Sequence, residues 1–179
     1  MLFHASYCSA KGRLTMLNSH MTSYEEERRT FHLDVPEHFN FATNVIDRWA
    51  QNPNKLAMLW IGPQGQEQHL TFAYFSERAH RAANAFTRLG IQKGQRVMVM
   101  LPRLPEWWEA VLGLIKLGAI FIPCTTLLTP KDIQYRAEIA EVQGFITDSE
   151  GAAKFDQVRD SCPTVKHTIL VDNGSERAH

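Results

Sequence analysis

Four short apolar segments alternate with three helical segments between residues 96 and 172. The apolar segments cover residues 96–101, 120–123, 144–148 and 166–172, and each suits a strand; the first suits a strand buried on both faces. The helical segments between them cover residues 106–117, about 130–142 and 152–162. Strands that alternate with helices favour a parallel sheet with right-handed crossovers. The sequence therefore predicts an α/β fold, a mostly parallel sheet with helices on both faces.

Further elements precede this alternation. Val45, Ile46, Trp49 and Ala50 recur at helical spacing. Residues 56–62 and 69–72 predict two strands of a hairpin, because the turn residues of 63–66 separate them. A helix is expected over residues 73–89, where apolar positions step by three and four, and Gly90 ends it.

Length and composition indicate one soluble globular domain. The chain has 179 residues, 44% hydrophobic and 21% charged, and its 19 basic residues balance 19 acidic ones. That balance argues against a nucleic-acid or anionic-membrane partner. We expect residues 1–22, which contain no acidic residue, to form a disordered N-terminal extension and residues 23–179 to form the domain. The extension is either an upstream addition before Met21 or an organellar transit segment.

Cysteine usage and hydropathy point to a reducing compartment and no membrane span. Cys8, Cys124 and Cys162 are too few and too scattered for a secreted disulfide scaffold. The apolar run over residues 110–128 approaches the length of a membrane span, but Lys116 lies inside it. We expect a helix, a turn and a buried strand in this run.

No known catalytic or phosphate-binding motif stands out. Gly113 and Gly118 have the spacing of a phosphate loop, but Ala119 and Ile120 follow in place of Lys and Ser or Thr, which favours close packing. The histidines lie too far apart in sequence to form a metal face on a helix, and each is expected to be an ordinary side chain. They are His4, His20, His32, His38, His69, His80, His167 and His179.

Three weaker candidates have both a functional and a structural interpretation. Glu106 and Glu109 are either paired carboxylates or part of a solvated polar stripe that includes Lys116. Trp107 and Trp108 either line an apolar ligand pocket or pack in a core or interface. Cys124 follows a predicted strand near the ligand edge of the sheet, or simply fills space. The structural interpretation is preferred for each candidate.

Several segments resemble the N-terminal part of the AMP-forming acyl-CoA synthetases, with the greatest likeness to the medium-chain branch. The residue run Leu-Pro-Arg-Leu-Pro-Glu-Trp-Trp at 101–108 carries the resemblance first. The other similar segments, in order, are residues 39–49, 93–97, 112–119, 122–126, 132–136 and 162–163. The likeness extends from about Tyr24 to Asp172.

The resemblance implies a complete enzyme that activates a carboxylic acid, often a fatty acid, with ATP and Mg²⁺ and transfers it to coenzyme A. The family's phosphate loop, adenine motif, ribose-binding Asp and catalytic Lys lie downstream of the similar region and are not found in these 179 residues. We therefore assign no catalytic, cofactor-binding or metal residue and expect no cofactor on this chain alone. Lys154 matches the coenzyme-contacting residues of some relatives only weakly.

The expected function is that of an N-terminal fragment of such a ligase, inactive by itself. An alternative is a non-catalytic binding or regulatory module that associates with a full-length synthetase, and a third is an independent small-ligand module. The cytoplasm is the expected location, with the mitochondrial matrix as the alternative. The acyl chain preference does not follow from these residues.

Overall fold

The computed structural model describes residues 23–33 and 36–171 of the chain. It divides into two compact units, Met1–Glu37 and His38–His179. In the first unit, helix α1 (Tyr24–Thr30) begins after Ser23, whose side chain accepts a hydrogen bond from the Glu26 backbone N–H at 3.4 Å. Acidic residues fill its first turn and arginines its last, as the helix dipole favours. The extension predicted over residues 1–22 lies outside the described residues.

The second unit contains the predicted parallel sheet. Its strands are β3 (Arg96–Met100), β4 (Ile120–Pro123), β5 (Gly144–Thr147) and β6 (His167–Leu170), in the order β4-β3-β5-β6. All three pairings are parallel, so the α/β prediction is confirmed. β4 and β6 are the edge strands, so both are partly exposed, although a buried strand was expected at β4.

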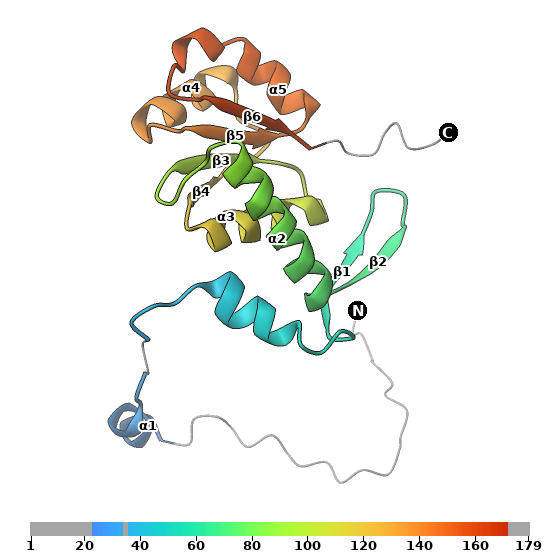
Figure 1. Cartoon of the computed structure of the whole chain (residues 1–179), viewed down its shortest axis with the longest axis vertical. Coiled ribbons are helices and arrows are strands. Elements are labelled where there is room, and N and C mark those ends of the chain that lie inside the picture. Colours follow the sequence, from blue (N-terminus) through green and yellow to red (C-terminus); the bar gives the residue numbers. More distant parts are fainter. Residues whose placement is uncertain (1–22, 34–35, 172–179) are drawn as a thin grey trace, which may run out of the picture. The chain divides into compact units, whose positions relative to one another are not determined.

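Helices cover both faces of this sheet. α2 (Phe72–Arg88) and α3 (Pro105–Leu117) lie on one face, and α4 (Pro130–Ile139) and α5 (Ser149–Asp156) lie on the other (Figure 1). Side chains of β3 alternate between these layers, as a pleated strand requires. Val97 and Val99 pack in the core below α2 and α3, whereas Met98 and Met100 pack in the core below α4 and α5.

A helical segment and a hairpin precede the sheet. The predicted helix near Val45 forms as a π-helix, η1 (Ala42–Asp47), with α-helical residues on either side. The hairpin pairs β1 (Leu56–Ile61) with β2 (Glu67–Thr71) in antiparallel register. β2 ends at Thr71, one residue earlier than predicted. The Thr71 side chain accepts a hydrogen bond from the Tyr74 backbone N–H and thereby caps α2.

Two helix boundaries differ from the predictions because of local capping. α5 begins at Ser149 and ends at Asp156, not over residues 152–162, because the Asp148 carboxylate accepts a hydrogen bond from the Gly151 backbone N–H at 2.9 Å. A separate 3₁₀ turn, η2 (Arg159–Ser161), follows. α4 ends at Ile139, before the expected residue 142, and Glu141 adopts a positive φ of 45° in the turn that follows.

The apolar run over residues 110–128 has the predicted organisation of helix, turn and strand. α3 ends where Gly118 takes a left-handed conformation with φ of 77°, and β4 then begins at Ile120. Among the described residues, no helix has the length and hydropathy needed to cross a membrane.

The close approach of α2 and α3 depends on Gly113. A Cβ atom at this position would lie 2.7 Å from the Cβ of Ala82 and 3.1 Å from the backbone nitrogen of Ala83. Gly113 is therefore a packing residue, as expected, and not part of a phosphate loop. The same contact brings polar side chains of the two helices together one turn away.

Candidate functional site

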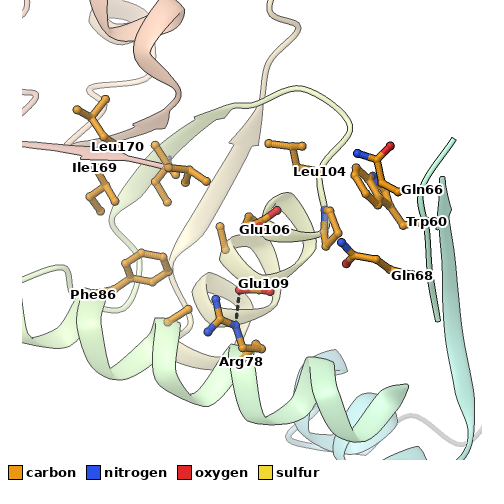
Figure 2. A pocket seen from close by; sticks show the side chains of 15 residues that line it. Trp60, Gln66, Gln68, Arg78, Phe86, Leu104, Glu106, Glu109, Ile169 and Leu170 are labelled. Carbon is orange, nitrogen blue, oxygen red and sulfur yellow. Dashed lines mark hydrogen bonds and ion pairs between the residues drawn. The ribbon is translucent and has the colours of Figure 1, made fainter. Parts of the chain in front are cut away.

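A cavity of about 580 Å³ opens between the hairpin, α2, α3 and the β6 edge of the sheet. Figure 2 shows Trp60 and Gln68 on the hairpin side, Arg78 and Phe86 from α2, and Ile169 from β6 around it. The sheet side of the cavity is apolar. Polar side chains of the hairpin and of the two helices line the opposite side, so the cavity has an amphipathic lining.

A partly buried hydrogen-bonded network, with the buried Glu109 carboxylate at its centre, lies at the polar side of this cavity. The Tyr74 hydroxyl donates to Oε1 of Glu109 at 2.6 Å, and Arg78 Nε donates to Oε2 of the same carboxylate at 2.7 Å. The Glu109 side chain is only 8% exposed. The expected solvated stripe is therefore wrong for Glu109, because α2 covers this face of α3 and supplies both partners.

The network fixes the protonation state of its donors. Burial and the Glu109 carboxylate raise the pKa of Tyr74 to about 12. The hydrogen bond to Glu109 also raises the pKa of Arg78 above its ordinary value. Tyr74 and Arg78 thus remain donors at neutral pH, and both Glu109 oxygens are engaged. Glu106 lines the same cavity, but the two glutamates do not form a pair of free carboxylates.

Lys116 also departs from the expected solvated stripe. Its side chain is 8% exposed, and its Nζ lies 2.5 Å from Oδ2 of Asp47 in η1. Ser76 donates to Oδ1 of Asp47 at 2.7 Å. Burial raises the pKa of the Asp47 carboxyl, but the hydrogen bonds from Lys116 and Ser76 lower it by more than burial raises it. The net pKa therefore lies below the ordinary value. This pair joins η1 to α3.

Trp107 and Trp108 lie in different surroundings, although core packing and pocket lining were considered for both. Their rings meet edge to face with centroids 4.9 Å apart. Trp107 packs against the core below α2 and α3, whereas Trp108 remains 46% exposed. Both line a second, apolar groove of about 370 Å³ between the N-terminal end of α3 and the hairpin, with Met58 and Trp60 on its hairpin side.

Two further candidates, Cys124 after β4 and Lys154 on α5, make packing and hydrogen-bond contacts within the fold. Cys124 is half-buried and packs against the core below α4 and α5, and burial raises the pKa of its thiol, which favours the protonated form. Lys154 donates to the Thr126 carbonyl oxygen at 2.8 Å and pairs with Glu150 at 2.9 Å. It thereby holds α5 against the loop after β4.

The described histidines and acidic residues form no recognisable metal site. Over residues 23–33 and 36–171, no three His, Cys, Asp or Glu side chains are grouped to hold a metal ion. His80 contacts the Ser76 carbonyl oxygen at 2.8 Å and lies 4.0 Å from Asp47. His4, His20, His179 and Cys8 lie outside the described residues.

The 580 Å³ cavity does not fit a triphosphate. Two carboxylates, Glu106 and Glu109, line it together with one guanidinium, that of Arg78, whose Nε is already occupied. A polyanion would meet net negative charge there. The cavity suits a neutral or apolar group better than a phosphate.

Sequence reasoning missed Tyr74, Arg78 and the hairpin glutamines as cavity residues. Tyr74 and Arg78 are four residues apart on a predicted helix and therefore share one of its faces, which is a signal the sequence does contain. The hairpin residues Gln66 and Gln68 carry no comparable signal, because their position depends on how the hairpin packs.

The family model for AMP-binding enzymes matches residues 45–179. Among curated proteins, the chain is 40% identical over 150 residues to the human mitochondrial acyl-coenzyme A synthetase ACSM1, covering 79% of this chain and 26% of that protein. It is 33% identical over 172 residues to human mitochondrial ACSM3, covering 92% of this chain and 29% of that protein. The chain thus spans about a quarter of the length of these relatives.

Solved structures agree with the fold. An anthranilate CoA ligase, AuaEII, in complex with anthranoyl-AMP superposes with a TM-score of 0.67 at 26% identity, covering 77% of this chain and 26% of the ligase. An acyl-CoA synthetase from Brucella canis gives a TM-score of 0.75 at 22% identity, covering 86% of this chain and 29% of that structure, and supports the fold alone.

Glu109→Gln tests the buried network, with Glu106→Gln as the matched control one turn away. We expect Glu109→Gln to lower the free energy of unfolding by about 1–3 kcal/mol, because Arg78 loses a charged acceptor. Glu106→Gln changes it by less than about 0.5 kcal/mol, since Glu106 has no ion-pair partner among the described residues. Urea denaturation measures both. Equal losses of unfolding free energy in the two variants would contradict the special role of Glu109.

Tyr74→Phe tests the raised pKa of the phenol. Because the folded-state pKa of about 12 exceeds the ordinary value of 10, the stabilisation by Tyr74 is fully present below pH 10 and is lost as pH rises toward 12. We expect the 295 nm absorbance titration to lose its latest step in Tyr74→Phe. Tyr135→Phe, which removes an exposed phenol on α4, should leave that step in place. Persistence of the late step in Tyr74→Phe would contradict the assignment.

Proposed function

Because this chain belongs to the AMP-binding enzyme family, we propose that it forms the N-terminal part of an acid:CoA ligase that activates a carboxylic acid with ATP. The observation that carries this proposal is the 40% identity over 150 residues to a human acyl-coenzyme A synthetase. The matched region, residues 45–179, includes the hairpin and every strand of the parallel sheet.

The proposed reaction has two steps. A carboxylate oxygen attacks the α-phosphorus of ATP and releases pyrophosphate, which leaves an acyl-adenylate. The thiol sulfur of coenzyme A then attacks the acyl carbon, AMP departs, and a thioester remains. When bound, Mg²⁺ offsets negative charge on the phosphates. Since the cavity does not fit a triphosphate, we assign neither of these steps to a residue of this chain.

The role proposed for the described residues is to build and hold one wall of the domain. The networks around Glu109 and Asp47 fix α2, α3 and η1 to one another. The amphipathic cavity lies beside the exposed edge of β6, where Leu170 is 61% exposed. This face suits contact with further polypeptide of the same ligase.

Mitochondria are the location we propose, in preference to the cytoplasm. The human relatives ACSM1 and ACSM3 are both named as mitochondrial proteins. Fluorescence microscopy of the chain with a C-terminal fluorescent tag, compared with a version lacking residues 1–22, checks this. We expect mitochondrial signal for the first and diffuse signal for the second. Diffuse cytosolic signal for the intact chain would refute the location.

Acid-dependent exchange of pyrophosphate into ATP tests the catalytic proposal. We expect no exchange by the purified 179-residue chain, but exchange by a chimera in which it replaces the matching quarter of human ACSM1. The same segment of human ACSM3 provides the control chimera. Exchange by the isolated chain, or activity of the ACSM3 chimera alone, would count against the proposal. A change in the activity of intact ACSM1 on mixing would favour the non-catalytic module.

A further inference from the structure

Helix α4 carries exposed apolar side chains on the face of the sheet away from α2 and α3 (Figure 1). Tyr135 is 62% exposed, and Ile139, four residues later on the same side of the helix, is 72% exposed. We propose that a second copy of this chain covers this surface, with the two α4 helices packed antiparallel about Tyr135. The inference goes beyond the proposed ligase function and does not rest on it.

The buried side of α4 determines which of its residues point outward. Ile133 and Ala137 are fully buried in the core below α4 and α5. With a turn of roughly 100° per residue, the direction opposite to these two side chains is that of Tyr135. Tyr135 is therefore at the centre of the outward face. The other exposed residues of this face are Lys131, Glu138 and Ile139.

The charges on this face are arranged for an antiparallel partner. Lys131 lies in the first turn of α4 and Glu138 in the last, and both lie to the same side of Tyr135. Among the described residues neither has an ion-pair partner, although Gln134 Nε2 donates to Glu138 Oε1 at 2.7 Å. A twofold axis that crosses the helix at Tyr135 reverses the direction of the second helix. Each Lys131 then faces Glu138 of the other copy.

Self-complementary charges point to a second copy of this chain as the occupant. Each copy supplies both the cation and the anion, so the match is completed by an identical surface. Parallel packing of the two helices would instead place like charges at the same level, which costs free energy. The antiparallel arrangement is therefore favoured.

The centre of the proposed interface is apolar. The two Tyr135 rings meet at the twofold axis, and central aromatic side chains often contribute much of the binding energy of an interface. Ile139 flanks them on the side opposite the ion pairs, and the exposed Leu127 extends the apolar surface before the helix begins. α4 has 10 residues and is about 15 Å long. A helix this short buries less than the roughly 800 Å² per partner of a standard interface, so the dimer is weak and reversible.

Sedimentation velocity of the purified chain from about 5 to 500 μM, without ATP or acid, tests the dimer. We expect a monomer–dimer equilibrium with a dissociation constant on the order of 100 μM. Tyr135→Ala should weaken it at least about tenfold. Tyr24→Ala, which removes a tyrosine of similar exposure (60%) from α1, should leave it unchanged. A monomer at every concentration would overturn the proposal, and so would association that Tyr135→Ala does not weaken.

Charge reversal tests the antiparallel register. Lys131→Glu and Glu138→Lys should each weaken self-association about tenfold, because like charges then face each other twice in the dimer. Both changes improve the match to the helix dipole, so loss of the helix would not explain weaker association.

An equimolar mixture of the two charge-reversal variants completes the test. It should recover the dissociation constant of the unmodified chain, since each mixed pair has opposite charges at both contacts. A mixture that associates no more tightly than either variant alone would overturn the antiparallel pairing. Because ATP and acid are absent, failure of this proposal leaves the ligase function to its own test.

Discussion

The burial of β3 on both of its faces is the constraint on which the rest of the second unit depends. Val97, Met98 and Val99 are fully buried, and alternate side chains enter different cores. Each such side chain contributes roughly 1.5–3 kcal/mol to stability, because its burial removes apolar surface from water. A strand of this kind needs helices above and below and parallel neighbours at its sides, which is the arrangement observed.

The approach of α2 to α3 then determines where polar groups are placed. Gly113 lets the helix backbones come close, and Glu109 consequently lies beneath α2 beside Tyr74 and Arg78. The buried carboxylate is stabilised only because both of its oxygens accept hydrogen bonds. Because burying an unpaired carboxylate would cost free energy, a glutamate buried on this face of α3 needs hydrogen-bond partners. It does not belong to a solvated stripe.

The two hollows flanking α3 differ in chemistry. The cavity toward β6 contains more carboxylates than cations, whereas the groove toward the hairpin has an apolar lining with Arg103 at its border. In the proposed ligase, the cavity toward β6 would face further polypeptide of the domain. Trp60 of the hairpin and Leu104 of the loop after β3 line both hollows.

Local sequence patterns were sufficient for most of the elements and for the parallel sheet. The stepping of apolar residues predicted α2, and Gly118 correctly marked the end of α3. The start of α5 was misplaced because Asp148 accepts a hydrogen bond from the Gly151 backbone N–H, so the helix begins directly after the strand and not at residue 152. The site residues were harder to predict. Glu106 and Glu109 look alike in sequence, and only α2 distinguishes them.

The sequence by itself determined the α/β class, the alternation of strands and helices, and the resemblance to acyl-CoA synthetases, since these depend on residue order and spacing. Only the tertiary structure determined that Glu109 and Lys116 are buried and paired. Glu109 pairs with Arg78, 31 positions away in the sequence, and Lys116 pairs with Asp47, 69 positions away. The tertiary structure also decided that Trp60 meets the Arg103 backbone across 43 positions. Contacts at such separations arise from packing between elements, and no local period encodes them.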